Sequence, residues 1–282
     1  MVVVDREKCT GCGSCVQICH QHCVSLVEQK VAIERVLCST CTQCVAMCAQ
    51  KALSWDGASP VSFEPALLPS AAQLDELFRE RRTIRDFADR QVDRAALEEI
   101  VSYGACAPTH NFDFRSVIID DPALISLFGE AAFRFSRRIY RLVFRPRLIR
   151  LLVLLAPRPV REEFRKAESK LRTVIGRGKG FATLPPDMVC IVGDRRIPLS
   201  LESAQYVLYT MALYAQVKGL ACRNLVGNQM IFNANSKIRR GLGLQKHERI
   251  FAVVGFGHPA VRFRNKVMGK KMPVQWNGAS TG

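Results

Sequence analysis

The feature that most constrains this chain is one cysteine spacing, C-x2-C-x2-C-x3-C, which occurs twice near the start of the sequence. Thiolates at positions i, i+3 and i+6 of a turning loop can hold three corners of one iron–sulfur cube, while backbone N–H groups of the loop stabilise the charge on sulfur. The fourth thiolate of each copy lies too far along the chain to close the same cube easily. The second copy begins 29 residues after the first and matches it at all four positions: Cys9, Cys12, Cys15 and Cys19, then Cys38, Cys41, Cys44 and Cys48.

In this spacing residues 1–57 resemble bacterial two-cluster ferredoxins, in which the fourth cysteine of each copy ligates the other cluster. The resemblance implies two [4Fe–4S] clusters with crossed ligands. Cys23 falls where the second copy has Ala52, so we expect it to be a small buried residue and not a ninth ligand. The implied ligands are Cys9, Cys12, Cys15 and Cys48 for the first cluster, and Cys38, Cys41, Cys44 and Cys19 for the second.

Two other uses of clustered cysteines fit less well. Zinc sites prefer two C-x2-C pairs for each ion, which would leave the third and fourth cysteine of each copy unexplained. A disulfide framework needs an oxidising compartment, and the apolar part of the opening MVVVDREKC is too short for the core of a signal peptide. Because cluster thiolates need a reducing interior, the sequence predicts a cytoplasmic protein.

The chain is strongly basic. Its 282 residues include 41 Lys and Arg against 25 Asp and Glu, a formal net charge of +16. Such a charge favours anionic partners, which include an acidic redox protein, an anionic lipid surface and an acidic substrate. Nucleic acid is not expected, since no recognised nucleic-acid motif is present. The longest apolar run near the middle, at 151–157, is well short of the ~20 residues that a membrane span needs.

The order of expected elements favours an α+β protein with a ferredoxin-like domain at 1–57, a linker at 58–69 and a larger domain at 70–282. In the first domain a strand over 52–55 is expected to pair with 24–27. In the larger one a helix starts at Ser70 and runs into 81–87, and Asp93 caps a second helix over 95–105. Further strands are predicted over 117–119, 188–192 and 250–255, and further helices over 198–219 and 235–242.

Four motifs in this order make residues 70–282 resemble the nitroreductase family of FMN-dependent oxidoreductases. The family's first helix ends in R-[RH]-[ST]-x-[RK]-x-F, here RRTIRDF at 81–87, and its next helix is followed by an A-P-[ST] loop, here APTHN at 107–111. A G-L pair after a buried helix is matched at 219–220, and a strand ending in V-G-[YF]-x-x-P is matched by VGFGHP at 254–259. The whole chain therefore resembles a fusion of a ferredoxin and a nitroreductase, which implies an α+β nitroreductase-like fold.

The resemblance also implies an FMN site and a homodimer. Guanidinium groups grip a phosphate through two oxygens at once, so Arg81 and Arg85 are candidates for the FMN phosphate, and Arg264 or Lys266 could close on it from the C-terminal tail. In the family one subunit contacts FMN through the basic run and its partner through the A-P-[ST] loop, in a domain-swapped dimer. The implied contacts are Arg81, Arg82, Thr83 and Arg85, then Pro108, Thr109, His110 and Asn111, with Leu225, Val226 and Gly227 near the flavin ring.

A basic and apolar insertion at about 130–180 departs most from the family. Eleven arginines lie between residues 134 and 172, and a nearly apolar run follows Pro146 at 148–155. Three roles stay open: a lid or dimer arm, a helix pair lying on anionic lipid at the inner membrane surface, and a dock for an acidic redox partner. Four of the arginines recur at helical spacing and form one cationic stripe: Arg134, Arg138, Arg141 and Arg145.

These features predict an oxidoreductase. Clusters pass one electron at a time, whereas a flavin can collect two and deliver a hydride equivalent. We expect a one-electron redox protein, such as ferredoxin or flavodoxin, to feed two clusters and then FMN, which reduces a small organic acceptor such as a nitro, quinone or enone group. The flavin N5 carries the chemistry, so no catalytic side chain is assigned. Two alternatives stay open: NAD(P)H reduces FMN with the clusters as the exit path, or the chain is an electron-transfer adaptor between proteins, with or without membrane association.

Overall fold

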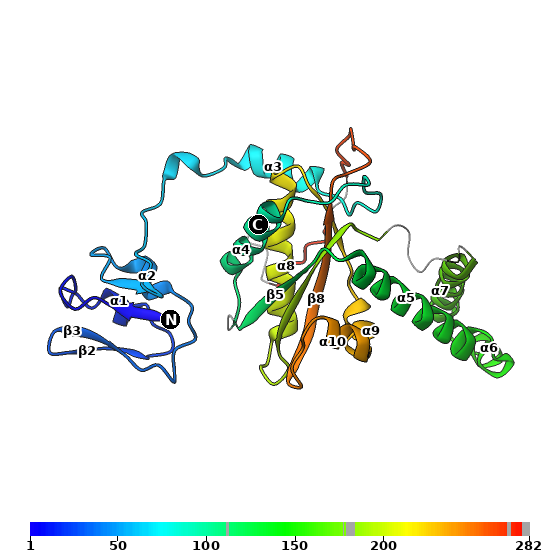
Figure 1. Cartoon of the computed structure of the whole chain (residues 1–282), viewed down its shortest axis with the longest axis horizontal. Coiled ribbons are helices and arrows are strands. Elements are labelled where there is room, and N and C mark those ends of the chain that lie inside the picture. The colour runs from blue at the N-terminus through cyan, green and yellow to red at the C-terminus, as the bar shows by residue number, and fades with distance from the viewer. Residues whose placement is uncertain (111–112, 177, 179–183, 270–271, 278–282) are drawn as a thin grey trace.

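A computed structural model gives the fold of the chain and describes residues 1–110, 113–176, 178, 184–269 and 272–277. The cysteine-rich part is a small unit of short strands and helices (Figure 1). Its hydrophobic centre contains four buried cysteines, Cys9, Cys15, Cys23 and Cys44, together with Val2, Val24, Val31, Val45 and Leu53. Its elements are β1 (Val2–Val4), α1 (Ser14–Gln17), β2 (Val24–Val27), β3 (Lys30–Ile33), α2 (Gln43–Met47) and β4 (Leu53–Trp55).

The pairing of these strands corrects one prediction. Residues 52–55 were expected to pair with 24–27, but β4 pairs with β1 and β2 pairs with β3, both antiparallel. The cause is the two-residue turn between β2 and β3. Glu28 and Gln29 have φ of 50° and 60°, the left-handed conformation that a tight hairpin turn requires at both central positions. The turn thus fixes β3 as the neighbour of β2, while β4 pairs with the N-terminal strand β1.

The rest of the chain is built on a four-stranded antiparallel sheet in the order β5-β6-β8-β7, with helices on both faces (Figure 1). This is the α+β arrangement that the sequence predicted. The elements are η1 (Pro65–Leu67), α3 (Ala71–Glu80), α4 (Arg94–Ser102), η2 (Tyr103–Cys106), β5 (Phe114–Ile119), α5 (Pro122–Ile139), η3 (Tyr140–Phe144), α6 (Arg147–Leu154), α7 (Arg158–Gly176), β6 (Asp187–Asp194), α8 (Ser200–Val217), β7 (Ala221–Asn224), α9 (Asn228–Asn233), α10 (Ser236–Gly241) and β8 (Glu248–Gly257).

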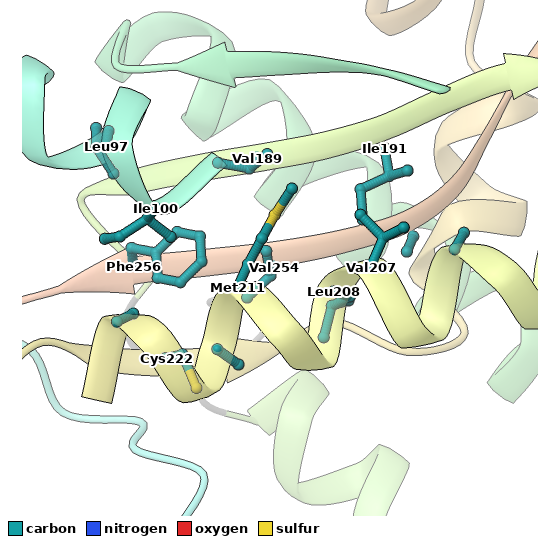
Figure 2. Packing of buried hydrophobic residues seen from close by; sticks show 14 of the residues in the cluster. Leu97, Ile100, Val189, Ile191, Val207, Leu208, Met211, Cys222, Val254 and Phe256 are labelled. Carbon is teal, nitrogen blue, oxygen red and sulfur yellow. The ribbon is translucent and has the colours of Figure 1, made fainter. Parts of the chain in front are cut away.

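Alternation along the buried strands divides the core into two layers. On β6, Val189 and Ile191 face one layer, where α4 and α8 cover the sheet, and Met188 and Cys190 face the other, which α5, α9 and α10 cover. Figure 2 shows the first layer, in which Met211 of α8 packs between the strands and Ile100 and Leu97 of α4. The residues of this layer are almost wholly excluded from water, so the sheet and α8 form a rigid support for the segments at their edges.

Helices α5, α6 and α7 form an arm that projects from the sheet, with α6 at its far end (Figure 1). Asp121 caps α5 by accepting a hydrogen bond from Ala123 N at 2.9 Å. The helix continues through the π-helical turn η3 until Pro146, which cannot continue a helix. The arginine stripe predicted from helical spacing therefore lies on α5 and η3, and the apolar run at 148–155 forms α6.

Candidate cluster and flavin sites

The eight cysteines of the two copies line two cavities, and each cavity takes cysteines from both copies. Cys9, Cys12, Cys15 and Cys48 line one of them. Cys19, Cys38, Cys41 and Cys44 line the other, together with Cys23. The fold thus brings together the same two sets of four thiols that the resemblance to ferredoxins implies, while ligation itself stays a prediction.

The donor sets fit four-iron cubes better than single ions. Within the described ranges, no three His, Cys, Asp or Glu side chains are placed to hold one metal ion. The thiolates of a [4Fe–4S] cluster bind separate irons and therefore stand farther apart than the four ligands of one zinc ion. Each cavity has one set of four thiols along its wall, which provides one thiolate for each iron of a four-iron cube.

The loops around the two cavities repeat in backbone conformation as well as in sequence. Left-handed residues occur at Gly11 and Thr40 and at Gly13 and Thr42, each pair 29 residues apart. At Gly11 a side chain has no room, because a Cβ there would lie 2.4 Å from the carbonyl oxygen of Gln29. The turns carry each loop tightly around its cavity, so that backbone N–H groups can reach the cysteine sulfurs. One such bond exists, from Ala52 N to Cys48 Sγ at 3.3 Å.

Burial disfavours the thiolate form of several of these cysteines in the absence of a cation. It raises the pKa of Cys15 and raises that of Cys44 to about 11. Bound iron would reverse this preference, since a metal ligand must be deprotonated. Cys23 is buried, as predicted, and its Sγ lies 3.4 Å from Cys19 Sγ. Burial, followed by this contact, raises the pKa of Cys23 to about 12.

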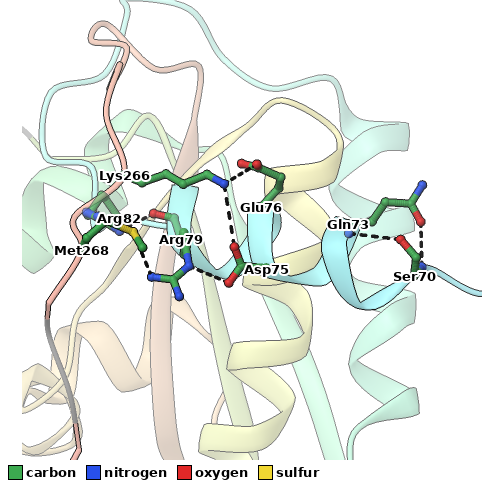
Figure 3. A network of polar contacts seen from close by, with 8 residues as sticks. All are labelled: Ser70, Gln73, Asp75, Glu76, Arg79, Arg82, Lys266 and Met268. Carbon is green, nitrogen blue, oxygen red and sulfur yellow. Dashed lines mark hydrogen bonds and ion pairs between the residues drawn. The ribbon is translucent and has the colours of Figure 1, made fainter.

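The basic run at 81–87 is not helical, which corrects the prediction that the first helix continues into it. Helix α3 begins at a capping box between Ser70 and Gln73 (Figure 3) and ends at Glu80. Arg82 terminates it, because one guanidinium nitrogen donates to the carbonyl oxygens of Arg79 and Arg81, each at 2.8 Å. The prediction that Arg82 contacts FMN therefore competes with a structural role for the same group.

After α3 the basic run follows the edge of the sheet. Ile84 N donates to the carbonyl oxygen of Cys222 on β7 at 3.3 Å, and Ala88 N donates to that of His258 at 2.9 Å. Arg82 and Ile84 line a cavity of about 400 Å³ together with residues 219–222 and 259–263. Thr83 is half-buried within the same run.

The guanidinium groups of this edge gather around β7. Arg81 lies over the ring of Tyr209 on α8, 5.7 Å from its centroid. Arg223 of β7 is buried, with 8% of its surface exposed. Burial, and next the positive charge of Arg85, lower the pKa of Arg223, which places those two cations close together. The sequence analysis missed Arg223; the available signal was an arginine directly after the small apolar residues Ala221 and Cys222.

This cationic group fits a phosphate. Arg223 is buried, while Arg85 and Asp86 nearby are exposed. A phosphate dianion would accept hydrogen bonds from several guanidinium nitrogens at once. The chemistry of the donor set therefore agrees with the flavin phosphate that the sequence analysis assigned to Arg81 and Arg85.

The other predicted flavin contacts lie on two loops. Pro108 and His110 are exposed and Thr109 is half-exposed, and His110 N donates to Ser203 Oγ of α8 at 3.2 Å. Asn111 lies outside the described residues. Leu225, Val226 and Gly227 form the turn from β7 into α9, in which Val226 is exposed and Gly227 has φ +87°. This turn presents backbone groups beside the strand that carries Arg223.

The C-terminal tail runs beside α3, so that Lys266 and Met268 lie next to side chains of that helix (Figure 3). Lys266 forms ion pairs with Glu76 and with Asp75, and Arg79 donates to Met268 Sδ at 3.5 Å. Lys266 is thus engaged with carboxylates of α3. Arg264 is exposed on the same tail. Whether either cation reaches the phosphate stays a prediction.

One more cavity lies between the cysteine-rich unit and the loop at 107–110. It measures about 550 Å³ and is lined from one side by Cys38 and its neighbours and from the other by His110, Asp113 and Ile197. Cys38 belongs to the second set of four thiols. Of the two thiol sets, this one therefore lies beside a predicted flavin loop.

Comparison with known families decides what the larger part of the chain is. Residues 78–258 match the nitroreductase family, and residues 1–21 match a 4Fe-4S binding domain. The chain belongs to the nitroreductase family. It is a flavin oxidoreductase of that family with a 4Fe-4S binding domain at its N-terminus, as the motifs predicted. The second cysteine copy lies outside the matched range of the 4Fe-4S domain.

Solved structures support the fold. A nitroreductase with bound FMN from Desulfitobacterium hafniense is 16% identical, with a TM-score of 0.51 over 71% of this chain and 97% of that chain. An iodotyrosine deiodinase bound to FMN and 3-iodo-L-tyrosine is 18% identical, with a TM-score of 0.51 over 73% of this chain and 99% of that chain. Both likenesses show the nitroreductase fold. Among curated proteins, none matches this chain.

Proposed function

We propose that this nitroreductase-family protein takes single electrons from a one-electron redox protein and delivers them in pairs to a small organic acceptor. Two [4Fe–4S] clusters would supply the one-electron path, and FMN would collect two electrons and carry out the reduction. The observation that carries the proposal is the presence of two cavities, each lined by one of the two sets of four thiols, in a chain whose remaining part belongs to a flavin oxidoreductase family.

The chain's own residues hold and orient these groups. The set of Cys9, Cys12, Cys15 and Cys48 would bind one cluster, and the set of Cys19, Cys38, Cys41 and Cys44 would bind the other. Arg81, Arg85 and Arg223 would hold the flavin phosphate at the edge of β7, and the turn at 225–227 would approach the flavin ring with its backbone.

We further propose that the protein is a homodimer, with the loop at 107–111 of each subunit completing the flavin site of its partner. Apolar side chains left exposed on α8 and on the tail support this arrangement, because a second copy would cover them. They are Leu201, Tyr206, Tyr209, Val217, Val261, Phe263 and Val267.

The placement of Cys38 beside His110 supports an order of electron transfer within this function. The second thiol set borders the cavity that reaches the flavin loop, so we assign it to the cluster nearer the flavin. The first thiol set would then hold the cluster nearer the external donor. The small acceptor is left at the level of its class, a nitro, quinone or enone group.

The function is tested by the rate at which different donors reduce the flavin. The full-length protein, purified without oxygen, is mixed with reduced ferredoxin, NADH or NADPH, and flavin absorbance is followed. We expect reduced ferredoxin to be the fastest donor. The variant Cys41→Ser should lose most of this rate, while light-driven chemical reduction of its flavin is unchanged.

Cys106→Ser is the matched control, since Cys106 is an exposed cysteine outside both thiol sets. It should keep the full rate with ferredoxin. The proposal is wrong if Cys41→Ser keeps that rate as well, or if NADH or NADPH reduces the flavin faster than ferredoxin does in the unmodified protein. The latter result would favour nicotinamide as the donor and the clusters as the exit path.

A further inference from the structure

Helix α6 turns its leucines toward water. Amphipathic helices of globular proteins normally place the stripe at i, i+3, i+4 and i+7 against the core. In α6 and its C-cap Leu155 this stripe faces solvent, and the exposed fraction of each of its residues is 57–82%. Leu154 is exposed to a similar degree. The residues of the stripe are Leu148, Leu151, Leu152 and Leu155.

The arm holds α6 in this orientation through its opposite side. Ile149 and Val153 are half-buried, and Arg150 of α6 forms an ion pair with Glu168 of α7 at 2.8 Å. At the base of this helix pair the ring of Phe144 packs on that of Phe164, with centroids 4.6 Å apart. The leucine stripe is therefore presented outward by a packed structure.

The arm that carries the stripe is rich in positive charge. Residues 134–172 contain eleven arginines and two lysines but only three glutamates. Those glutamates are already paired: Glu168 with Arg150 and Arg172, Glu162 with Arg158, and Glu163 with Lys166. The arm thus keeps an excess of guanidinium groups along with its exposed apolar face.

A small cavity between α6 and α7 is lined by both basic and apolar side chains. It measures about 140 Å³, and Arg150, Arg161 and Arg165 line it together with the apolar Val153, Leu154 and Phe164. Guanidinium groups above an apolar wall suit a phosphate that is attached to a hydrocarbon chain. Glu168, which also lines the cavity, is already engaged by Arg150 and Arg172.

We propose that the arm docks on an anionic lipid surface, with the leucine stripe of α6 entering the boundary between headgroups and acyl chains and the arginines binding lipid phosphates. A helix with leucines on one face and arginines around it is the kind that lies in the plane of a membrane interface. No described helix is long and apolar enough to cross a bilayer. The docking therefore amounts to peripheral attachment.

Charge decides between lipid and a second copy as the occupant. Two copies of the arm in contact at this stripe would bring the arginine-rich segments of both chains together. Like charges repel across such a contact, whereas basic residues near an anionic membrane are attracted to it. An anionic lipid surface would both remove the exposed leucines from water and offset the excess positive charge of the arm.

The test is flotation of the full-length protein with vesicles of phosphatidylcholine, with and without about one third phosphatidylglycerol. We expect binding to the anionic vesicles, weak binding to the neutral ones, and a fall in binding as salt increases. A Leu152→Trp variant should show a blue shift of tryptophan emission with anionic vesicles, and brominated acyl chains should quench it.

The decisive variant is Leu148→Gln/Leu152→Gln, which should lower vesicle binding by at least about tenfold because two leucines no longer enter the apolar layer. Leu67→Gln/Leu68→Gln is the matched control, since these adjacent leucines are at least as exposed but lie at the end of η1 and its C-cap, outside the arm. It should bind as the unmodified protein does. Circular dichroism and flavin content confirm that both variants are folded.

Three results would overturn the proposal: equal binding to neutral and anionic vesicles, unchanged binding of the α6 variant, or an equal loss in the control. If instead the α6 variant dissociates the protein in the absence of vesicles, the stripe is an interface between chains. Flavin reduction by ferredoxin in solution is independent of these outcomes, so failure here leaves the proposed function to its own test.

Discussion

Gly13 and Thr42 stand 29 residues apart and take the same left-handed backbone, with φ of +78° and +61°, each immediately before a short helix of its cysteine loop. The second copy therefore keeps the geometry of the first although it lacks the glycine. A threonine in this conformation is strained by roughly 1 kcal/mol relative to glycine. The fold retains the strain because the loop has to turn around its cavity.

Exchanging these two residues should have opposite effects on stability. Thr42→Gly relieves the strain and should stabilise the cysteine-rich unit by about 0.5–1 kcal/mol. Gly13→Thr should destabilise it by a similar amount, because a Cβ at Gly13 meets no atom within 4 Å and only the backbone conformation is affected. Thermal loss of cluster absorbance measures both. Equal melting of the two variants would contradict the shared geometry.

Gly11 provides a contrasting case, since an added Cβ would lie 2.4 Å from the Gln29 carbonyl oxygen. Gly11→Ala adds this clash to the backbone strain and should lower the thermal midpoint for cluster loss more than Gly13→Ala does. Iron content after purification is the second measurement. A Gly11→Ala protein with full iron content and an unchanged midpoint would show that the loop does not pack as described.

Arg223 and Arg85 should contribute to FMN affinity. Removing a charged hydrogen-bond donor from a phosphate costs about 1.5–3 kcal/mol, so Arg85→Gln and Arg223→Met should each weaken FMN binding by roughly ten- to a hundredfold. Quenching of flavin fluorescence on binding to the flavin-free protein gives the dissociation constant. Arg90→Gln, an exposed arginine just after the basic run, is the control and should bind FMN normally. An unchanged affinity in Arg223→Met would remove Arg223 from the site.

The ion pair between Arg115 and Glu248 should make stability depend on pH. Two hydrogen bonds of 2.7 and 2.9 Å join the side chains across the central strand β6. The bond from Arg115 is the main cause that lowers the pKa of Glu248 to about 2, from an ordinary value of 4.5. Because the folded pKa is the lower one, the stabilisation is present above pH 4.5 and is lost as the pH falls toward 2.

Glu248→Gln tests this linkage. The variant should be less stable than the unmodified protein by about 2 kcal/mol at neutral pH, and the difference should shrink as the pH falls from 4.5 toward 2. Denaturant unfolding at several pH values measures it. Glu130→Gln is the control, because its partner Arg134 and Glu130 itself are both largely exposed and their pair contributes little. A pH-independent difference between Glu248→Gln and the unmodified protein would contradict the assignment.

The homodimer should depend on the C-terminal tail. Val261, Phe263 and Val267 are exposed by 41–59% in the single chain, and we expect a partner subunit to cover them. Deletion of residues 261–277 should therefore shift the protein from dimer to monomer at micromolar concentration, as measured by light scattering during size-exclusion chromatography. A truncated protein that remains dimeric would place the interface elsewhere.

The sequence predicted most where chemistry restricts the choice of residue. The two cysteine spacings identified the eight thiols, and the resemblance to two-cluster ferredoxins implied the two crossed sets that line one cavity each. The start of α3 at its N-cap Ser70 also lies where the sequence predicted it, since side-chain capping is a local signal. Asp93 stands at the N-cap of α4 as predicted, but its side chain makes no capping hydrogen bond. Buried strands were found by their apolar runs, although β5, β6 and β8 are all longer than predicted.

Sequence reasoning failed where tertiary contacts override local signals. The β2–β3 hairpin turns at Glu28 and Gln29, which carry none of the glycine or asparagine preference of such turns, so the pairing of β4 was assigned to the wrong strand. Helix α3 ends before the basic run because Arg82 caps it, a use of arginine that its sequence position does not reveal. Arg223 escaped notice because only the fold brings β7 beside Arg85.

The central claim is that two four-iron clusters and one flavin share this chain, and metal and flavin quantitation with the visible spectrum of the protein purified without oxygen tests it most directly. The account predicts about eight iron atoms and one FMN per chain, with iron–sulfur absorbance that bleaches on one-electron reduction. About four iron atoms would contradict the second cluster, about one zinc ion would contradict both, and a protein that holds no flavin would contradict the proposed function.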